Sequence, residues 1–358
     1  MSKYVLVGCD LHDKTILLKM SVNKGVAEKR SFENSRNGRR VMIGELKRRG
    51  FQYKAQVVFA YEASGLGFGL HDELTENGIC CHVLAPSKIE RSPKQRRCKT
   101  DEKDAEHILE ILRGHYLGGN KLPDIWIPDL QTRDDRELVR ARLDAQDKCS
   151  AVKTQVRTLL KRKGVSKPKD AGDGWTKEYW SWLQALTECD LPLAYGARQN
   201  LASLLRQIRH LEKEVERFDR EIGKLARTPR YRAGMKALLK LKGVGPICAI
   251  VFLTEMGDPR RFSNRRQIGA FLGLVPASDE TGEADDRKGH ITHQGPPRVR
   301  HVLNQAVWNR VRFDPDEKKV YERIAAKNPK HKKIAVVAAM RRLAIRMWHL
   351  AKEAKAVS

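Results

Sequence analysis

Residues 4–12, YVLVGCDLH, form a short and strongly apolar run that carries one acid, Asp10. A second apolar run, TILLKMSV at residues 15–22, follows after the polar pair DK. Two β-rich runs with so short a break predict paired strands joined by a tight turn. Further strands are predicted near residues 26–34, 55–63 and 78–86, with helices around residues 36–49 and 67–77 between them. Strands followed by alternating helices and strands predict an α/β fold with a mixed sheet covered by helices.

The charge balance points to a polyanionic partner. The chain has 358 residues, with 70 Lys and Arg against 44 Asp and Glu, which gives a formal net charge of +26. Basic side chains that neutralise phosphates release condensed counterions, so nucleic acid is the expected partner. No apolar run approaches the roughly 20 residues of a membrane-spanning helix. The amino terminus is too polar and acidic for a signal peptide, so a soluble, cytoplasmic protein is expected.

Two aspartates open a predicted helix directly after a basic stretch, in RRCKTDEKDAEHIL at residues 96–109. Thr100 is a good N-cap, and acids in a first helical turn are favoured by the helix dipole, so capping is the ordinary interpretation. Asp101 and Asp104 nevertheless share one face, because residues three apart are neighbours on a helix. They can therefore act together on one ligand.

Two more acids end or interrupt apolar strands. Asp10 lies inside the first strand, where an unpaired carboxylate would cost several kcal/mol, and Glu62 ends the strand at residues 55–63. Convergence of Asp10, Glu62, Asp101 and Asp104 would require divalent cations between them, and carboxylates with water suit Mg²⁺. In a basic protein the expected substrate is a nucleic-acid phosphodiester. The alternatives are a buried ion pair for Asp10 and a turn role for Glu62.

A long helix is predicted after residue 195. Apolar residues recur there at alternating spacings of three and four, with charges between them: Leu201, Leu204, Ile208, Leu211, Val215, Phe218, Ile222 and Leu225. This repeat is typical of a coiled-coil arm, although an amphipathic helix packed within one domain shows the same pattern. The arm can pair with residues 130–164 of the same chain or with another subunit.

The last third of the chain changes character. LKGVGP at residues 241–246 suits a helix-hairpin-helix turn, whose exposed backbone N–H groups can hold a phosphate. A Gly-, Pro- and Arg-rich segment follows at residues 273–300, and such loops often carry function. Four basic residues of this segment are expected to contact nucleic acid: Arg287, Lys288, Arg298 and Arg300. Lys99, in the basic stretch before the acidic helix, is expected to do the same.

These motifs together resemble the DEDD transposase family of insertion sequences, whose relatives include the Piv-type DNA invertases. The resemblance is carried, in order, by GCDLHDKT, YEASG, KTDEKDAEHI, FLGLVP, ETGEADDRKGHITHQG and RVRHVL. It implies an RNase H-like domain of the Holliday-junction-resolvase type over residues 1–128, a helical and coiled-coil region over 129–230, and a small, mostly helical transposase domain over 231–358.

The resemblance also assigns roles. It implies that Asp10, Glu62, Asp101 and Asp104 bind Mg²⁺, and that a bridge RNA encoded by the element directs recombination of donor and target DNA. It implies a homo-oligomer, a dimer or a tetramer, linked through the coiled coil. The expected activity is DNA transposition by phosphoryl transfer.

The nucleophile position departs from the family pattern. Most of the family carries a serine directly before a glycine in the loop after FLGLVP, and this chain has Thr281 there. Threonine offers the same hydroxyl but adds a methyl group that restricts its side-chain torsion. Ser278, three residues earlier, is the alternative nucleophile. Two other functions remain open: a branched-DNA nuclease that uses the same acids with water, and a non-catalytic nucleic-acid scaffold.

Overall fold

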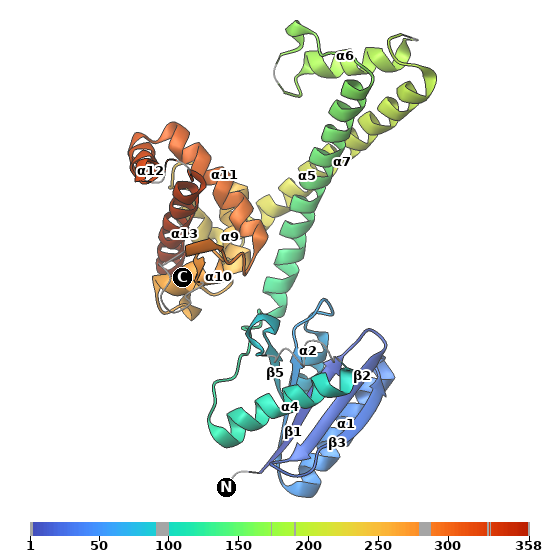
Figure 1. Cartoon of the computed structure of the whole chain (residues 1–358), viewed down its shortest axis with the longest axis vertical. Coiled ribbons are helices and arrows are strands. Elements are labelled where there is room, and N and C mark those ends of the chain that lie inside the picture. The colour runs from blue at the N-terminus through green and yellow to red at the C-terminus, as the bar shows by residue number, and fades with distance from the viewer. Residues whose placement is uncertain are drawn as a thin grey trace. The chain divides into compact units, whose positions relative to one another are not determined.

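The computed structural model describes residues 3–90, 100–172, 174–189, 191–278, 288–327, 329 and 331–356. The chain divides into two compact units, Met1–Ile127 and Pro128–Ser358. The first unit contains β1 (Tyr4–Leu11), β2 (Thr15–Val22), β3 (Glu28–Glu33), α1 (Arg36–Tyr53), β4 (Gln56–Glu62), α2 (Gly69–Glu76), β5 (Cys80–Leu84) and α4 (Asp101–Gly118) (Figure 1).

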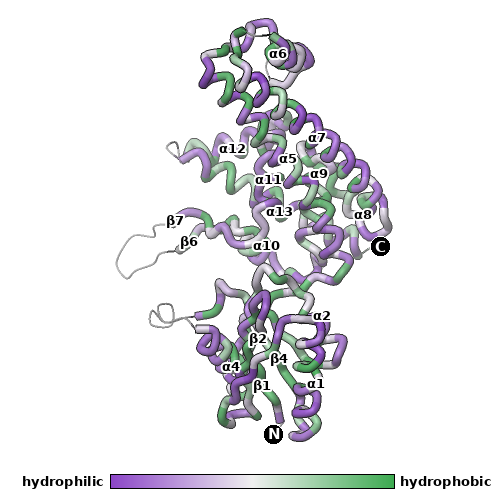
Figure 2. The backbone as a smooth tube through the Cα atoms, turned by 90° about the vertical axis from the view of Figure 1, so that its right-hand side faces the viewer, coloured by the Kyte–Doolittle hydropathy of each residue, from purple (hydrophilic) through white to green (hydrophobic). Residues whose placement is uncertain are grey.

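The first unit is built on a five-stranded sheet with the order β3-β2-β1-β4-β5. Strands β1, β2 and β3 pair antiparallel, whereas β4 runs parallel to β1 and β5 runs parallel to β4. The predicted mixed α/β sheet is confirmed. Figure 2 colours its central strands largely as hydrophobic, which fits a sheet buried on both faces.

Alternation along β1 decides which side chains meet which helix. Val5, Val7 and Cys9 lie in a buried cluster with residues of α1 and α2. Leu6 lies in a separate cluster with residues of α4. Asp10 has the same parity as Leu6 and therefore points to the α4 side of the sheet. The β-strand pattern thus turns the acid toward the helix that carries Asp101 and Asp104.

Gly8 permits the close approach of α4 to β1. A Cβ atom at this position would lie 2.2 Å from the carbonyl oxygen of Ala105 and 2.4 Å from the backbone nitrogen of Leu109. Both contacts are to helix backbone, which cannot move aside as a flexible side chain can. The short distance between Asp10 on β1 and the acids at the start of α4 therefore requires a residue without a Cβ atom at position 8.

We expect Gly8→Ala to lower the free energy of unfolding by about 1–3 kcal/mol or more, because overpacking at a helix–strand contact displaces backbone. Gly44→Ala is the matched control, since Gly44 lies within α1 and a Cβ there meets nothing within 4 Å. That control is expected to gain up to about 1 kcal/mol from helix propensity. Urea titrations of both variants check the pair, and equal stability of the two would contradict the close-approach argument.

The second unit is mostly helical. It contains α5 (Leu130–Arg162), α6 (Lys177–Glu188), α7 (Tyr195–Arg227), α8 (Pro229–Leu238), α9 (Pro246–Met256), α10 (Arg265–Phe271), β6 (Pro276–Ser278), β7 (Lys288–Ile291), α11 (Pro297–Phe313), α12 (Pro315–Lys327) and α13 (Lys333–Ala356). The predicted boundary near residue 230 lies inside this unit and stays a prediction.

Helices α5 and α7 pair along their length in the same chain (Figure 1). Lys153 binds Glu212 at 2.7 Å, and Arg142 binds Asp219 at 2.9 Å, so the two helices run antiparallel. The predicted apolar repeat lies on α7, but only part of it is buried. Leu201, Leu204, Ile208 and Ile222 are buried, whereas Leu211, Val215, Phe218 and Leu225 are half-buried.

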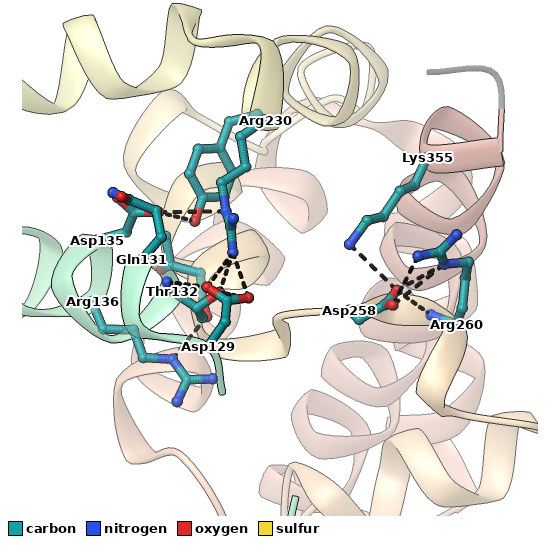
Figure 3. Close-up of polar contacts among 11 residues, drawn as sticks. Asp129, Gln131, Thr132, Asp135, Arg136, Arg230, Asp258, Arg260 and Lys355 are labelled. Atoms are coloured by element: carbon teal, nitrogen blue, oxygen red, sulfur yellow. Dashed lines mark hydrogen bonds and ion pairs between the residues drawn. The ribbon is translucent and has the colours of Figure 1, made fainter. Parts of the chain in front are cut away.

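The start of α5 is fastened to α8 and α9. The Asp129 carboxylate caps α5 by accepting a hydrogen bond from the Thr132 amide at 2.7 Å, and it accepts hydrogen bonds from Arg230 at 2.9 Å (Figure 3). Tyr231 donates to the buried Asp135 at 2.6 Å. The buried Glu255 of α9 receives two hydrogen bonds from one α5 guanidinium, that of Arg140, at 2.8 and 3.0 Å. The buried carboxylates of Asp135 and Glu255 are thus compensated by hydrogen bonds, and that of Glu255 also by an ion pair.

The carboxy-terminal core surrounds α9, whose buried side chains are mostly apolar. Its N-terminus is preceded by the predicted helix-hairpin-helix turn between α8 and α9. Gly243 in this turn has a φ of +78°, and a Cβ there would lie 2.6 Å from the Cγ of Arg310. Arg310 also donates to the Lys242 carbonyl at 2.7 Å. Close packing against α11 thus accounts for this glycine. Within the described ranges, none of the helices combines the length and the apolar composition of a membrane span.

Candidate metal centre

The two strand acids lie side by side at one edge of the sheet. Strands β1 and β4 are parallel, and their pairing runs up to Cys9 beside Tyr61. Asp10 and Glu62 are the next residue on each strand. Because parallel strands end at the same edge, both carboxylates belong to that edge, on the face covered by α4. The side chain of Asp10 is 20% exposed, so solvent and a ligand can reach it.

The helix acids are brought to this edge by the start of α4. The Thr100 hydroxyl accepts a hydrogen bond from the Lys103 amide, so the predicted N-cap is confirmed. Asp101 is the first residue of the helix and is 61% exposed, whereas Asp104 is buried. The difference follows from the helix packing on β1, because Asp104 lies one turn further into the contact.

The structure adds a residue that the sequence interpretation missed. The Nε2 atom of His12 lies 2.9 Å from Oδ2 of Asp10 and 3.5 Å from Oδ1 of Asp101. One ligand atom from each of these three side chains lies within 4.8 Å of the others, which makes them a group able to hold a metal ion. Glu62 and Asp104 are not in that group. The spacing of Asp10 and His12, two residues apart at a strand end, is the signal that could have identified the histidine.

Electrostatics agree with a crowded acidic site. Burial raises the pKa of Asp10, and the nearby charges of Asp101 and Asp104 raise it further, against the lowering effect of His12. Partial desolvation lowers the pKa of His12, but the Asp10 and Asp101 carboxylates outweigh it, so the pKa is raised overall. The raised pKa of His12 reflects the negative field of these two carboxylates, whereas the raised pKa of Asp10 is caused first by its burial.

A lysine pair holds the first turn of α4 against the sheet. Lys19, buried on β2 beside Gly8, reaches Oε1 of Glu102 at 2.7 Å, and Lys29 of β3 reaches Oε2 at 2.6 Å. Hydrogen bonds from both lysines lower the pKa of Glu102 to about 2. Glu102 follows Asp101 directly in the sequence. This clamp, formed by Lys19, Lys29 and Glu102, therefore helps to position the neighbouring Asp101, and nothing in the sequence spacing revealed it.

The donor set fits a divalent cation. Carboxylate oxygens are the ligands that Mg²⁺ and Mn²⁺ take in proteins. At a metal–ligand distance of about 2.1 Å, adjacent octahedral ligands lie about 3 Å apart. The contacts of 2.9 and 3.5 Å between the carboxylate oxygens and the imidazole nitrogen are close to that spacing. Because all three ligand atoms lie within 4.8 Å of one another, metal binding here requires only small movements of the side-chain ends.

Two of the residues predicted to contact nucleic acid lie in the described part of the carboxy-terminal segment with their side chains placed. Arg298 donates to Asp144 at 2.8 Å, and Arg300 donates to the carbonyl oxygens of Leu272, Gln294 and Gly295 at 3.0–3.2 Å. Burial lowers the pKa of Arg300. Both arginines thus have partners inside the fold, and their roles in nucleic-acid binding stay predictions.

Other predicted residues of the carboxy-terminal loop and the basic stretch cannot be placed. Lys99, Thr281 and Arg287 lie outside the described residues. Ser278 and Lys288 belong to the paired strands β6 and β7, and their side chains lie outside the described part of the chain.

Comparison with known proteins gives the family. Residues 7–164 match the DEDD transposase profile of IS110 elements, and residues 235–322 match the profile described as "Transposase IS116/IS110/IS902 family". The chain is 31% identical over 326 residues to "Putative transposase y4qE" of Sinorhizobium fredii, covering 84% of this chain and 76% of that protein. It is 24% identical to the "Transposase for insertion sequence element IS1533" of Leptospira borgpetersenii, covering 86% of each chain. With its sheet-edge acids and both family segments in order, this chain belongs to the DEDD transposases of the IS110 family.

Proposed function

We propose that this transposase is a metal-dependent recombinase that cuts and rejoins the DNA of an insertion sequence under the direction of an RNA encoded by the element. The observation that carries the proposal is the meeting of the Asp10 and Asp101 side chains at the sheet edge where Glu62 also ends its strand. The net charge of +26 supports a nucleic-acid substrate. The strand order β3-β2-β1-β4-β5 supports an RNase H-like domain.

In this proposal the sheet-edge acids, Asp10, Glu62, Asp101 and Asp104, form the cation site. Mg²⁺ bound there would polarise a phosphoryl oxygen and stabilise charge on the attacking and leaving oxygens. Asp10 and Glu62 are held rigidly by paired strands, and Asp101 and Asp104 are held by α4 and its clamp. Rigid placement of ligands is what a phosphoryl-transfer site requires, because positioning and electrostatics supply most of the catalysis.

The covalent step would use a hydroxyl of the carboxy-terminal loop, Thr281. Its oxygen attacks the scissile phosphorus, a Thr281 O–P bond forms, and the P–O bond to one DNA strand end breaks. The hydroxyl proton leaves to solvent or a base, and the released DNA oxygen takes up a proton. The phosphoester keeps the bond energy, so a second DNA hydroxyl can displace Thr281 and seal the new strand without an external energy source.

Identification of the RNA tests the guided part of the proposal. We expect purified protein to carry a discrete structured RNA encoded beside its own gene. Removal of that RNA with ribonuclease should abolish site-specific DNA cleavage, and its addition should restore cleavage. Sequencing of the bound RNA and a cleavage assay check both points. A mixture of unrelated cellular RNAs, with cleavage unaffected by ribonuclease, would contradict guidance while leaving the DNA-cutting activity in place.

Oligomerisation through the α5–α7 pair is part of the same proposal. Leu211, Val215 and Phe218 stay half-buried in the middle of α7, although they continue the apolar repeat. A second copy packing on this stripe would complete their burial, which is worth on the order of 1 kcal/mol for each half-buried side chain.

We expect Val215→Lys combined with Phe218→Lys to lower the mass measured by light scattering while leaving the helix content unchanged. Because Leu201, Leu204 and Ile208 are buried within the chain, substitution of the half-buried stripe is a cleaner test than deletion of residues 201–225. Lys213→Gln, at an exposed position of the same helix, is the control. An unchanged mass for the double variant would rule out this stripe as the subunit contact.

A further inference from the structure

His12 is fixed at the candidate centre by its backbone as well as by its ring. The residue follows β1 directly, and its amide donates to the Thr15 carbonyl at 2.9 Å. Its carbonyl accepts a hydrogen bond from the Asn34 side chain at 2.6 Å. Alternation places the side chain on the same side of the sheet as Asp10. The turn between β1 and β2 thus holds the imidazole at the acids before any ligand arrives.

The ring nitrogen lies where a cation ligand would be expected. Nε2 contacts one carboxylate oxygen of Asp10 and one of Asp101, and these two acids come from different elements of the fold. The three ligand atoms form a compact triangle, with no pair more than 4.8 Å apart. The His12 side chain is 49% exposed, so its ring can turn without disturbing the core. Nε2 donates its proton to the Asp10 carboxylate in this arrangement, and a cation that displaces this proton would find a nitrogen lone pair beside the two acids.

We propose that Nε2 of His12 is a direct ligand of one metal ion, beside Asp10 and Asp101, and that this nitrogen makes the centre favour Mn²⁺ over Mg²⁺. The inference rests on the metal centre of the proposed function and adds a ligand to it. Mg²⁺ is a hard cation that takes oxygen ligands, whereas imidazole binds first-row transition ions more readily. Exchange of one oxygen position for nitrogen therefore changes which ion the same acids hold.

Pulsed electron paramagnetic resonance of the Mn²⁺-loaded full-length protein tests the ligand directly. A directly bound imidazole gives a nitrogen modulation, which should change its pattern when the protein is made with ¹⁵N-labelled histidine. We expect the modulation to vanish in His12→Asn and in His12→Gln. His210→Asn is the matched control, because His210 is exposed on α7 in the other unit, and it should keep the modulation. A modulation that persists in both His12 variants would overturn the assignment.

Metal affinities measured by calorimetry supply the second readout. Loss of the nitrogen ligand should weaken Mn²⁺ binding at least about tenfold, because loss of only a hydrogen-bonding partner of a metal ligand already costs about 10–100-fold. Mg²⁺ binding should change much less, because a water or amide oxygen can fill the position. Retained Mg²⁺ binding also shows that the variant is folded. Equal losses for the two ions would show that His12 only organises the carboxylates, and would exclude it as a ligand.

The outcomes separate this inference from the proposed function. Nitrogen modulation in a protein that fails to cut its DNA under any metal condition would support His12 as a ligand and count against the recombinase. Cleavage of DNA by a protein whose bound Mn²⁺ shows no nitrogen modulation would support the recombinase and refute the role of His12.

Discussion

Asp101→Asn is expected to reduce DNA cleavage by on the order of 10³-fold or more while leaving nucleic-acid binding nearly unchanged. Asp101 contributes one of the grouped ligand atoms and is 61% exposed, so its replacement removes a charge from the centre without opening the core. A metal contributes several kcal/mol of transition-state stabilisation, and each 1.36 kcal/mol corresponds to about tenfold in rate. Single-turnover cleavage of labelled DNA measures the loss.

The helix itself should tolerate this change. Asp101 also favours the N-terminus of α4, but an exposed charge in a first turn contributes only about 0.3–1 kcal/mol. Glu106→Gln is the matched control, because Glu106 is an exposed acid on the same helix and lies outside the candidate centre. Full cleavage by Asp101→Asn would refute the proposed metal centre as the site of DNA cleavage.

Thr281→Ala is expected to abolish strand exchange and every covalent protein–DNA product. Alanine has no hydroxyl that could attack the phosphorus. The affinity for nucleic acid should change little, because the loss of one hydroxyl is small beside so many positive charges. Thr281→Ser should stay active and can exceed the parent, because it removes the methyl group that crowds the attacking oxygen. The measurement is a denaturing gel of protein incubated with divalent metal and nicked, labelled DNA, followed by peptide mapping of the adduct.

The mapped peptide distinguishes the candidates. An adduct on Thr281 supports the role that the family pattern implies for this position. An adduct on Ser278 moves the nucleophile three residues, and Ser278→Ala is the variant that should then lose activity. Cleavage to free ends, with no adduct from any variant, would overturn the covalent mechanism and favour a hydrolytic nuclease of branched DNA.

Much of the first unit could be predicted from local sequence. The runs around Asp10 and Glu62 have strand character, Thr100 is a standard N-cap, and the order of strands and helices indicates the mixed sheet. These features depend on neighbouring residues, which sequence patterns record well. His12 was missed because a histidine beside a turn has many ordinary roles, and only tertiary structure brings Asp101 to its ring.

Long-range features could not be predicted in the same way. Lys19 is a single charged residue within an apolar strand, and no nearby residue marks its partner Glu102, which lies far along the chain. Arg300 suggested a phosphate contact, but the structure supplies it with carbonyl oxygens that no sequence pattern marks. The apolar repeat of α7 predicted the helix but not its partner, because α5 and a second subunit would satisfy the same pattern.

The α5–α7 pair joins two hydrophobic cores, and this affects how the second unit should unfold. One core holds Ile208 and the other Ile222, and α7 buries no side chain between them. The helices are held there chiefly by half-exposed apolar residues and ion pairs, which contribute little at a solvent-exposed position. The two ends therefore form separate cooperative units linked by continuous helices, and amide hydrogens in the middle should exchange sooner than those at either end.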